Sequence, residues 1–371
     1  MKKKVLITGG AGFIGSHLAD ELIDNGYEVR ALDNLNRQVH GHNAQRPDYL
    51  HPDVELIVGD VRDKNAVKQA LAGVDAVFHL AALVGVGQSM YQIEEYTDVN
   101  NVGTAVLLEA LIDQPVKKLV VASSMSIYGE GLYKNGAGNF VHECDRKLDD
   151  LRNQHWNMYD ASGLDYTPVP TPEYKKPSLS SVYALSKYDQ ERLCLIAGKA
   201  YNIPTTALRF FNVYGTRQAL SNPYTGVLAI FASRLLNNNA PMIFEDGLQK
   251  RDFVHVKDVA RACRLALETP EANGEVINVG SGKRYTIQEI AQKIAHVMGK
   301  DIAPEVNGKY RVGDIRHCFA DLTKARTLLG FEPRVDFEDG LAELALWLEG
   351  QIAVDSVNKA TEELASRGLT V

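Results

Sequence analysis

Tyr183 and Lys187 are two residues that could move a proton, and they stand four positions apart in a stretch, 182–201, whose pattern predicts a helix. Side chains at positions i and i+4 share one face of a helix, so the phenol and the ammonium should be neighbours. A free tyrosine has a pKa of about 10. Because a nearby positive charge favours the phenolate, Tyr183 could take a proton from a substrate hydroxyl. This spacing is common by chance, so the prediction depends on the residues around it.

Ser124 is a third candidate, because it follows a strand expected over residues 118–122. In open parallel sheets, ligands bind at the carboxyl ends of the strands. A hydroxyl at that edge could donate to the substrate oxygen and relay its proton. We therefore predict Ser124, Tyr183 and Lys187 as the catalytic residues.

The start of the chain contains a glycine-rich turn of the kind that holds a dinucleotide. An expected strand at 5–8 leads into it, and an expected helix at 14–25 follows it. Glycine allows a tight turn and the close approach of a pyrophosphate, and the helix N-terminus favours its negative charge. The predicted contacts in this turn are Gly9, Gly12, Phe13, Ile14 and Gly15.

Asp33 indicates which dinucleotide this turn would bind. It follows the second expected strand, 29–32, where a carboxylate can bond both ribose hydroxyls and repel a 2′-phosphate. This favours NAD over NADP, and a helix-capping aspartate is the alternative. NAD would accept the hydride as Tyr183 takes the proton, and both Tyr183 and Lys187 would contact it.

Other strand ends add candidate cofactor contacts. Asp60 could accept a hydrogen bond from the adenine amino group, or it could belong to an ordinary turn. Small residues after the fourth strand would let the cofactor lie across the strand ends, whereas His79 is expected to be a packed core histidine. The further predicted contacts are Asn34, Asp60, Val61, Leu80, Ala81 and Ala82.

The elements that must position these residues alternate in the pattern of a doubly wound α/β fold. Short apolar runs predict buried parallel strands, and helix-length segments such as 65–72 separate them. The predicted strands are 5–8, 29–32, 56–58, 76–80, 118–122 and 205–211.

Three regions are expected along the chain. Residues 1–180 would form a Rossmann domain with an insertion at 132–178, which its Gly, Asn, Asp and Pro content predicts to be long and irregular. Residues 181–350 would complete the sheet, interleaved with a smaller mixed α/β lobe that binds substrate. Residues 351–371 would form a helical extension, amphipathic from residue 352, for packing or dimerisation.

Composition excludes several other classes of protein. The 371 residues carry a net charge of −7 without a basic block, which argues against nucleic acid as a partner. No stretch approaches the roughly 18 apolar residues of a membrane span. The four cysteines are far apart and form no CxxC pair, which argues against a zinc site or a disulfide framework. We expect a cytoplasmic enzyme without a metal.

Three further motifs complete a resemblance to the extended short-chain dehydrogenase/reductase family, in its NAD-dependent nucleotide-sugar epimerase/dehydratase branch. They occupy residues 211–215, 251–259 and 311–314, and the resemblance extends from about residue 4 to 350. It implies that arginines hold the substrate diphosphate, which suits their bidentate donors. The implied substrate contacts are Ser124, Ser126, Asn212, Tyr224, Arg251, Arg311, Asp314 and Cys318, with Asn100 behind the sugar at the cofactor.

Met125 and Ser126 narrow the reaction implied by this resemblance. Dehydratases of the branch carry an Asp-Glu pair there, decarboxylases a Glu at position 126, and 3,5-epimerising enzymes a Cys at position 125. Neither Met125 nor Ser126 can do acid–base work, which leaves a 4-epimerase that oxidises C4 and returns the hydride to the other face. A 4-ketoreductase or decarboxylase on the same fold, and a non-catalytic NAD-sensing protein, are the alternatives.

The resemblance leaves the substrate and the assembly partly open. Segments such as 85–89 and 218–226 resemble dTDP-L-rhamnose 4-epimerases, whereas Cys318 matches UDP-hexose 4-epimerases. A nucleotide-diphosphate sugar is expected in either case, with UDP-N-acetylhexosamine as a further candidate. Family members pair helices like 93–112 and 182–201 across a two-fold axis, so a homodimer is expected.

Overall fold

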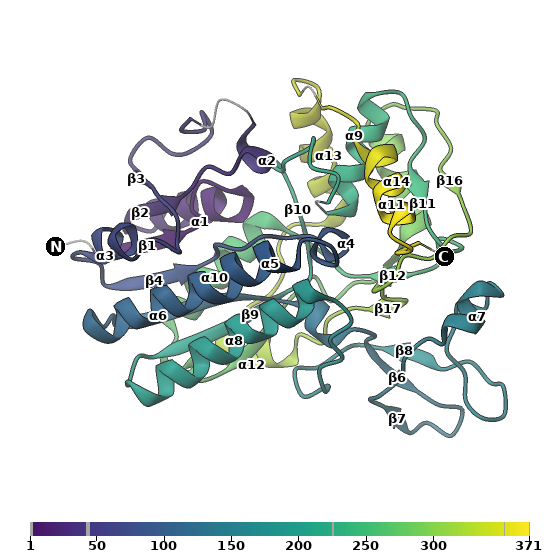
Figure 1. Cartoon of the computed structure of the whole chain (residues 1–371), viewed down its shortest axis with the longest axis horizontal. Helices are drawn as coiled ribbons and strands as arrows, with labels where there is room; N and C mark the ends of the chain where they lie inside the picture. Colours follow the sequence, from purple (N-terminus) through teal and green to yellow (C-terminus); the bar gives the residue numbers. More distant parts are fainter. Residues whose placement is uncertain (1–2, 42–44, 225, 352, 371) are drawn as a thin grey trace.

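The computed structural model describes residues 3–41, 45–224, 226–351 and 353–370. At its centre lies a seven-stranded parallel sheet of order β14-β9-β5-β4-β1-β2-β3 (Figure 1). The chain leaves β1 on one side and returns to its other side at β4, so the strand order reverses between these two strands. This confirms the predicted doubly wound α/β fold. The strands are β1 (Lys4–Thr8), β2 (Glu28–Asp33), β3 (Glu55–Val58), β4 (Ala76–His79), β5 (Lys118–Ser124), β9 (Thr205–Phe210) and β14 (Val276–Val279).

Helices cover both faces of the sheet because alternate strand residues point to opposite sides. Val5 and Ile7 of β1 enter one apolar core, and Leu6 enters the other. The first core is covered by α1 (Phe13–Asp24), α10 (Val256–Glu268) and α12 (Thr323–Leu329), and the second by α3 (Lys64–Leu71), α6 (Gly103–Asp113) and α8 (Val182–Ala200).

A smaller lobe with its own apolar core stands beside the carboxyl ends of the strands (Figure 1). It combines three helices with two- and three-stranded sheets, as the predicted mixed α/β lobe requires. Its elements are α9 (Val227–Leu236), α11 (Ile287–Val297), α13 (Phe337–Leu348), β10 (Asn212–Tyr214), β11 (Met242–Ile243), β12 (Lys250–Arg251), β13 (Phe253–His255), β15 (Tyr285–Thr286), β16 (Glu305–Val306) and β17 (His317–Cys318).

The chain also forms several short helices. They lie between the longer helices and strands, and several of them approach the site described below. They are α2 (Arg37–His40), α4 (Val86–Ser89), α5 (Ile93–Tyr96), the π-helix η1 (Thr97–Val102), and the 3₁₀ helices η2 (Met125–Tyr128) and η3 (Pro270–Ala272).

The insertion at 132–178 lies mostly outside helices and strands, as expected, but it also contains a small sheet that was not predicted. Its strands β6 (Leu132–Lys134), β7 (Phe140–Val141) and β8 (Thr167–Val169) form an antiparallel sheet of order β7-β6-β8, accompanied by α7 (Leu148–Arg152). Two- and three-residue strands between glycine and asparagine turns leave no alternation long enough to detect.

The C-terminal helix, α14 (Val357–Ser366), is shorter than predicted. Residues 352 and 371, the limits of the predicted amphipathic segment, lie outside the described residues. Across the part of the chain that the structure describes, no helix has the length and apolarity to cross a membrane.

Candidate active site

A cavity of about 620 Å³ opens at the carboxyl ends of the central strands, where the strand order reverses. This is the place at which open α/β sheets bind ligands. Within the described ranges, no group of three or more His, Cys, Asp or Glu side chains is arranged to hold a metal ion.

Most predicted site residues line this cavity, although they come from both halves of the chain. The glycine turn and the ends of β2 and β4 form one end, and the catalytic candidates and the smaller lobe form the other. The residues concerned are Gly9, Gly12, Phe13, Ile14, Gly15, Asp33, Asn34, Val61, Leu80, Ala81, Ala82, Ser124, Ser126, Tyr183, Lys187, Asn212, Tyr224, Arg251, Arg311 and Asp314.

The glycine turn has the geometry of a phosphate cradle. Gly9 has a φ of +72°, which favours glycine, and a Cβ at Gly15 would lie 2.3 Å from the Gly9 carbonyl oxygen. Helix α1 begins after Gly12, which offers no side chain to cap the helix. The free N–H groups of the first turn therefore face the cavity end, where a pyrophosphate would complete their hydrogen bonding.

Asp33 is held firmly at the end of β2. Its carboxylate accepts hydrogen bonds from the backbone N–H groups of Ala11 (3.0 Å) and Leu35 (2.9 Å), and the side chain is largely buried. A carboxylate has lone pairs for further donors, and Asp33 lines the cavity. The turn, this acid and the lysine deeper in the cavity together fit NAD.

Three predicted contacts, Asp60, Asn100 and Cys318, are not among the residues that line the cavity, and their ligand roles stay predictions. Arg62 and Asn34 occupy the Asp60 carboxylate, and the hydrogen bonds from Arg62 lower its pKa to about 2.

The other two side chains are enclosed by protein. Asn100 is fully buried and bonds the backbone of Leu83 and the hydroxyl of Ser186. Cys318 lies against Thr171 and is 1% exposed. Asn100 therefore holds the loop after β4 through its hydrogen bonds with the Leu83 backbone.

Tyr183 is positioned by the first turn of α8. Ser181 caps this helix by accepting a hydrogen bond from the Ala184 N–H, and the Tyr183 N–H donates to the Ser89 hydroxyl at 3.0 Å. Burial raises the pKa of Tyr183 to about 12, and a hydrogen bond with Ser124 opposes this rise. The predicted serine and tyrosine therefore do meet in the cavity.

Lys187 is held by a residue that the sequence analysis missed. Its ammonium donates to Gln190 Oε1 at 2.6 Å, and burial lowers its pKa to about 8. Gln190 in turn donates to Thr104 Oγ1 at 2.9 Å. Gln190 stands three positions after Lys187, so helical spacing was the available signal.

His79 is a packed core histidine, as predicted. Its ring lies 2.8 Å from the hydroxyls of both Thr8 and Thr104. Burial lowers its pKa to about 3, so the ring is neutral at physiological pH. It connects β4 to Thr104, which also bonds Gln190, the residue that holds Lys187. The His79 ring does not line the cavity.

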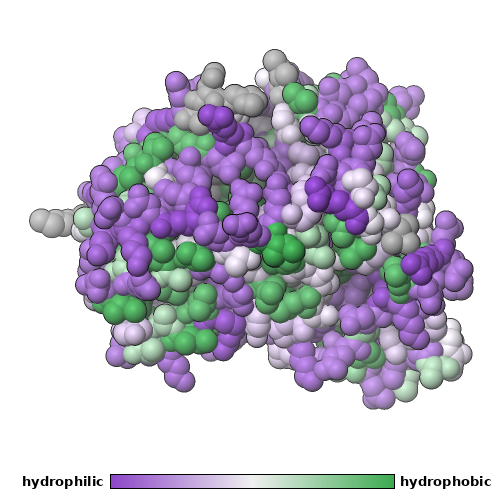
Figure 2. All heavy atoms as spheres, in the orientation of Figure 1, coloured by the Kyte–Doolittle hydropathy of each residue, from purple (hydrophilic) through white to green (hydrophobic). Residues whose placement is uncertain are grey.

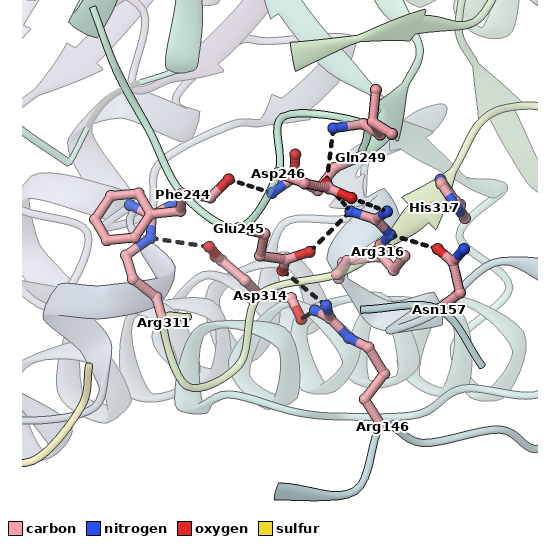
Figure 3. Close-up of polar contacts among 12 residues, drawn as sticks. Arg146, Asn157, Phe244, Glu245, Asp246, Gln249, Arg311, Asp314, Arg316 and His317 are labelled. Atoms are coloured by element: carbon pink, nitrogen blue, oxygen red, sulfur yellow. Dashed lines mark hydrogen bonds and ion pairs between the residues drawn. The ribbon is translucent and has the colours of Figure 1, made fainter. Parts of the chain in front are cut away.

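The two arginines expected at a diphosphate differ in their surroundings. Arg251 donates to the backbone carbonyls of Lys250 (3.1 Å) and Arg316 (3.0 Å), and so joins β12 to β17. Arg311 pairs with Asp314 at 2.9 Å, and its guanidinium lies 4.5 Å from the centre of the Phe244 ring (Figure 3). Arg311 keeps more of its donors free for a ligand.

A buried ionic network lies beside this pair and was not predicted (Figure 3). Arg146, from the insertion, pairs with Glu245 at 2.7 Å and with Glu130 at 3.2 Å, and it donates to the Asp314 carbonyl at 2.6 Å. Arg316 bonds Glu245 as well. The insertion therefore braces the segment 311–314 from outside the cavity.

Fold and cavity define an α/β enzyme that uses a dinucleotide. The chain matches the model of the NAD dependent epimerase/dehydratase family over residues 5–146 and 157–280, and it belongs to that family.

Similar proteins with assigned activities cover nearly the whole chain. A dTDP-L-rhamnose 4-epimerase of Burkholderia thailandensis is 35% identical over 94% of this chain and 96% of its own. A UDP-N-acetyl-alpha-D-glucosaminuronate decarboxylase of Bacillus cytotoxicus is 33% identical over 94% and 98%. The structure of Thermus thermophilus UDP-glucose 4-epimerase in complex with NAD superposes with a TM-score of 0.74, at 31% identity over 94% of this chain and 100% of that one.

Proposed function

We propose that this protein is an NAD-dependent nucleotide-sugar 4-epimerase. The observation that carries the proposal is the composition of the catalytic end of the cavity. Ser124, Tyr183 and Lys187 all line the cavity, while the positions after Ser124 hold Met125 and Ser126, which supply neither an acid nor a base. Such a set supports removal and return of a proton and a hydride, with no second acid–base step.

The residues divide the work as follows. Tyr183, as the phenolate, accepts the proton of the C4 hydroxyl, and Ser124 donates a hydrogen bond to the same oxygen. NAD, when bound at the glycine turn and Asp33, would supply the hydride acceptor for C4 and the hydride donor for the return step. Lys187 keeps a positive charge near the phenolate. After the 4-keto sugar turns its other face, Tyr183 returns the proton to the oxygen, so no net oxidation occurs.

The substrate class follows from the side of the cavity that the smaller lobe forms. Arg311 offers guanidinium donors to a diphosphate, and Asn212, on β10, lines the same cavity. We propose a dTDP- or UDP-linked sugar, with dTDP-L-rhamnose and UDP-hexoses or UDP-N-acetylhexosamines as the candidates. The 35% identity to a dTDP-L-rhamnose 4-epimerase supports the first.

A decarboxylase is the second candidate, because a relative with that activity is 33% identical. It would need an acidic residue where this chain has Ser126, whose hydroxyl instead donates to Ser124 Oγ at 2.8 Å. A 4-ketoreductase would need an external supply of reduced cofactor.

The deciding experiment incubates the purified protein separately with UDP-glucose, UDP-N-acetylglucosamine, UDP-glucuronate and dTDP-L-rhamnose, without added cofactor, and resolves the products by NMR. We expect inversion at C4 of one of them with no net NADH. The Tyr183→Phe variant should lose activity by about 10³-fold, and the exposed Tyr159→Phe should not. Release of carbon dioxide or net NADH would overturn the epimerase.

We also propose that the protein is a cytoplasmic homodimer. Exposed apolar residues gather on one side of the molecule, over α6 and α8 (Figure 2). On α8 they are Leu185, Leu193 and Ile196, and on the adjoining segment they are Ile93, Val102 and Ile112. A helix pair of this kind can bury its apolar side against a second copy across a two-fold axis.

A further inference from the structure

Helix α14 lines the cavity, although nothing in the sequence analysis placed it there. Its cavity-facing residues are Val357, Ala360, Thr361 and Leu364, and Leu369 follows after the helix. The first four have the spacing i, i+3, i+4, i+7, which places them on one face of the helix. A whole helix face, and not a single edge residue, therefore forms part of the wall.

One end of this segment is fastened to α9. The Asn237 side chain donates to the Ala353 carbonyl at 2.9 Å, and Arg234 donates to Asn358 Oδ1 at 3.0 Å. Figure 1 shows α14 over the smaller lobe, close to α9. These bonds hold the start of the helix at the rim of the cavity.

The other end is fastened to the segment expected at the diphosphate. The Val312 N–H donates to the Leu369 carbonyl at 3.0 Å, and Arg311 pairs with Thr370 in an antiparallel bridge. Arg367 lies 4.4 Å from the centre of the Tyr91 ring. The segment therefore contacts the substrate half of the cavity and is remote from the glycine turn.

Leu364 faces the catalytic end of that half. A Cβ at Gly87 would lie 3.3 Å from both Leu364 methyl groups. Two residues after Gly87, the Ser89 hydroxyl accepts the hydrogen bond from the Tyr183 N–H. Leu364 thus packs against α4, the same short helix that holds the backbone of the catalytic tyrosine.

The wall formed by Val357, Ala360, Thr361, Leu364 and Leu369 is almost entirely apolar. Four of its five residues are aliphatic, and the hydroxyl of Thr361 is the only polar side-chain group among them. None of them can pair with a carboxylate, and an unpaired buried charge is strongly disfavoured.

We propose that residues 357–369 complete the sugar-binding part of the cavity and select sugars that carry no charge where they meet α14. This rests on the proposed function, because it takes the ligand to be a nucleotide sugar. It names Leu364 and Thr361 as specificity-determining residues.

The first test compares Leu364→Ala with Leu346→Ala, the same change at a position of α13 that is 70% exposed. We expect Leu364→Ala to raise KM about tenfold through lost apolar contact, with kcat within about twofold and co-purified NAD unchanged. Leu346→Ala should match the wild type. An unchanged KM, or an equal loss of NAD, would overturn the proposal.

The second test measures selectivity in the Tyr183→Phe background with NAD bound. Thr361→Lys adds a cation to the wall, and Ser366→Lys adds the same charge at an exposed position of α14. Calorimetry should show Thr361→Lys shifting the affinity ratio of UDP-glucuronate to UDP-glucose about tenfold toward the uronate. An equal shift in Ser366→Lys, or none, would overturn the selection.

Hydrogen exchange separates failure of this inference from failure of the proposed function. UDP-glucose, UDP-glucuronate and dTDP-L-rhamnose are each added to the NAD-bound wild type, and exchange is followed over 357–366. At least one ligand should protect α14 while α13 stays unchanged, whether or not turnover occurs. Bound ligand without protection of α14 would contradict the wall even if epimerisation were found.

Discussion

Burial shifts the pKa values of the two proposed catalytic side chains, Tyr183 and Lys187, in opposite directions. It raises the pKa of Tyr183 to about 12 and lowers that of Lys187 to about 8, so each is pushed toward its neutral form. The reaction needs the charged pair. A positive charge placed beside the phenol lowers its pKa, so a cationic nicotinamide next to Tyr183 would restore the phenolate. The sequence analysis expected a nearby positive charge to favour the phenolate, and the lysine ammonium together with the oxidised nicotinamide would supply that charge.

Because His79 is buried, the free energy of unfolding should fall as the pH is lowered. Its folded pKa of about 3 lies below the ordinary value of 6.5. As pH falls from 6.5 toward 3, the unfolded chain gains a proton on this ring that the folded chain does not. The free energy of unfolding should therefore fall by about 1.4 kcal/mol per pH unit because of this residue.

The variant His79→Gln isolates this contribution, since an amide can bond both threonines without titrating. Urea unfolding of the variant between about pH 6.5 and pH 4 should show a shallower loss of stability than that of the wild type. His155→Gln, at an exposed position, is the matched control. If His79→Gln and the wild type lose stability in parallel, the ring is not held neutral by the fold.

At the scale of elements, the insertion acts as a brace on the substrate segment. The Arg146 side chain is 4% exposed, and it joins two buried glutamates to the Asp314 carbonyl. Burial raises the pKa of Glu245, and the neighbouring Arg146 opposes that rise. Removing Arg146 would leave buried carboxylates short of positive charge.

Arg146→Met should therefore lower the free energy of unfolding by about 3 kcal/mol and raise KM for the nucleotide sugar. The same insertion offers the control Arg152→Met, because Arg152 pairs with Asp149 in an exposed bridge worth about 1 kcal/mol or less. Thermal unfolding and initial rates on both variants check this. Equal stabilities for the two would show that the network does not hold the insertion in place.

The sequence could predict those features that depend on residues close together along the chain. Six of the seven central strands and the helices α1, α3 and α8 were predicted to within a few residues, because long apolar runs and helical periodicity are local, whereas β14 was missed. The site residues near glycine turns and strand ends followed from the same elements. Some partners of the Asp60 and Asn100 side chains could not be predicted, because Asn34 and Ser186 reach them through tertiary packing.

Other parts of the molecule depend on contacts between distant segments. Arg146 meets Glu245 across 99 residues, and Arg234 meets Asn358 across 124. No spacing rule in a single sequence reports such pairs. For this reason both the ionic brace and the wall of α14 emerged only from the structure.

At the scale of the whole molecule, the apolar surface of α8 is the feature that a single chain leaves unexplained. Leu185, Leu193 and Ile196 are 46%, 38% and 59% exposed, and helical spacing places them on one side of α8. Exposed apolar groups clustered in this way mark protein–protein contacts. The cavity is lined by residues of one chain, so pairing through this surface would leave each site complete.

Ile196→Glu tests this assembly, because it would place a carboxylate in an apolar interface, where an unpaired charge is costly. Light scattering at micromolar concentration should give the mass of two chains for the wild type and of one chain for Ile196→Glu. Leu346→Glu, at the exposed position on α13, should remain dimeric. The monomeric variant should also keep co-purified NAD, since the glycine turn lies on the opposite side of α6 from the next chain. The α8 interface is refuted if the wild type scatters as a single chain, or if the Ile196→Glu variant stays dimeric. If the monomeric variant loses NAD, pairing supports the cofactor end of the site.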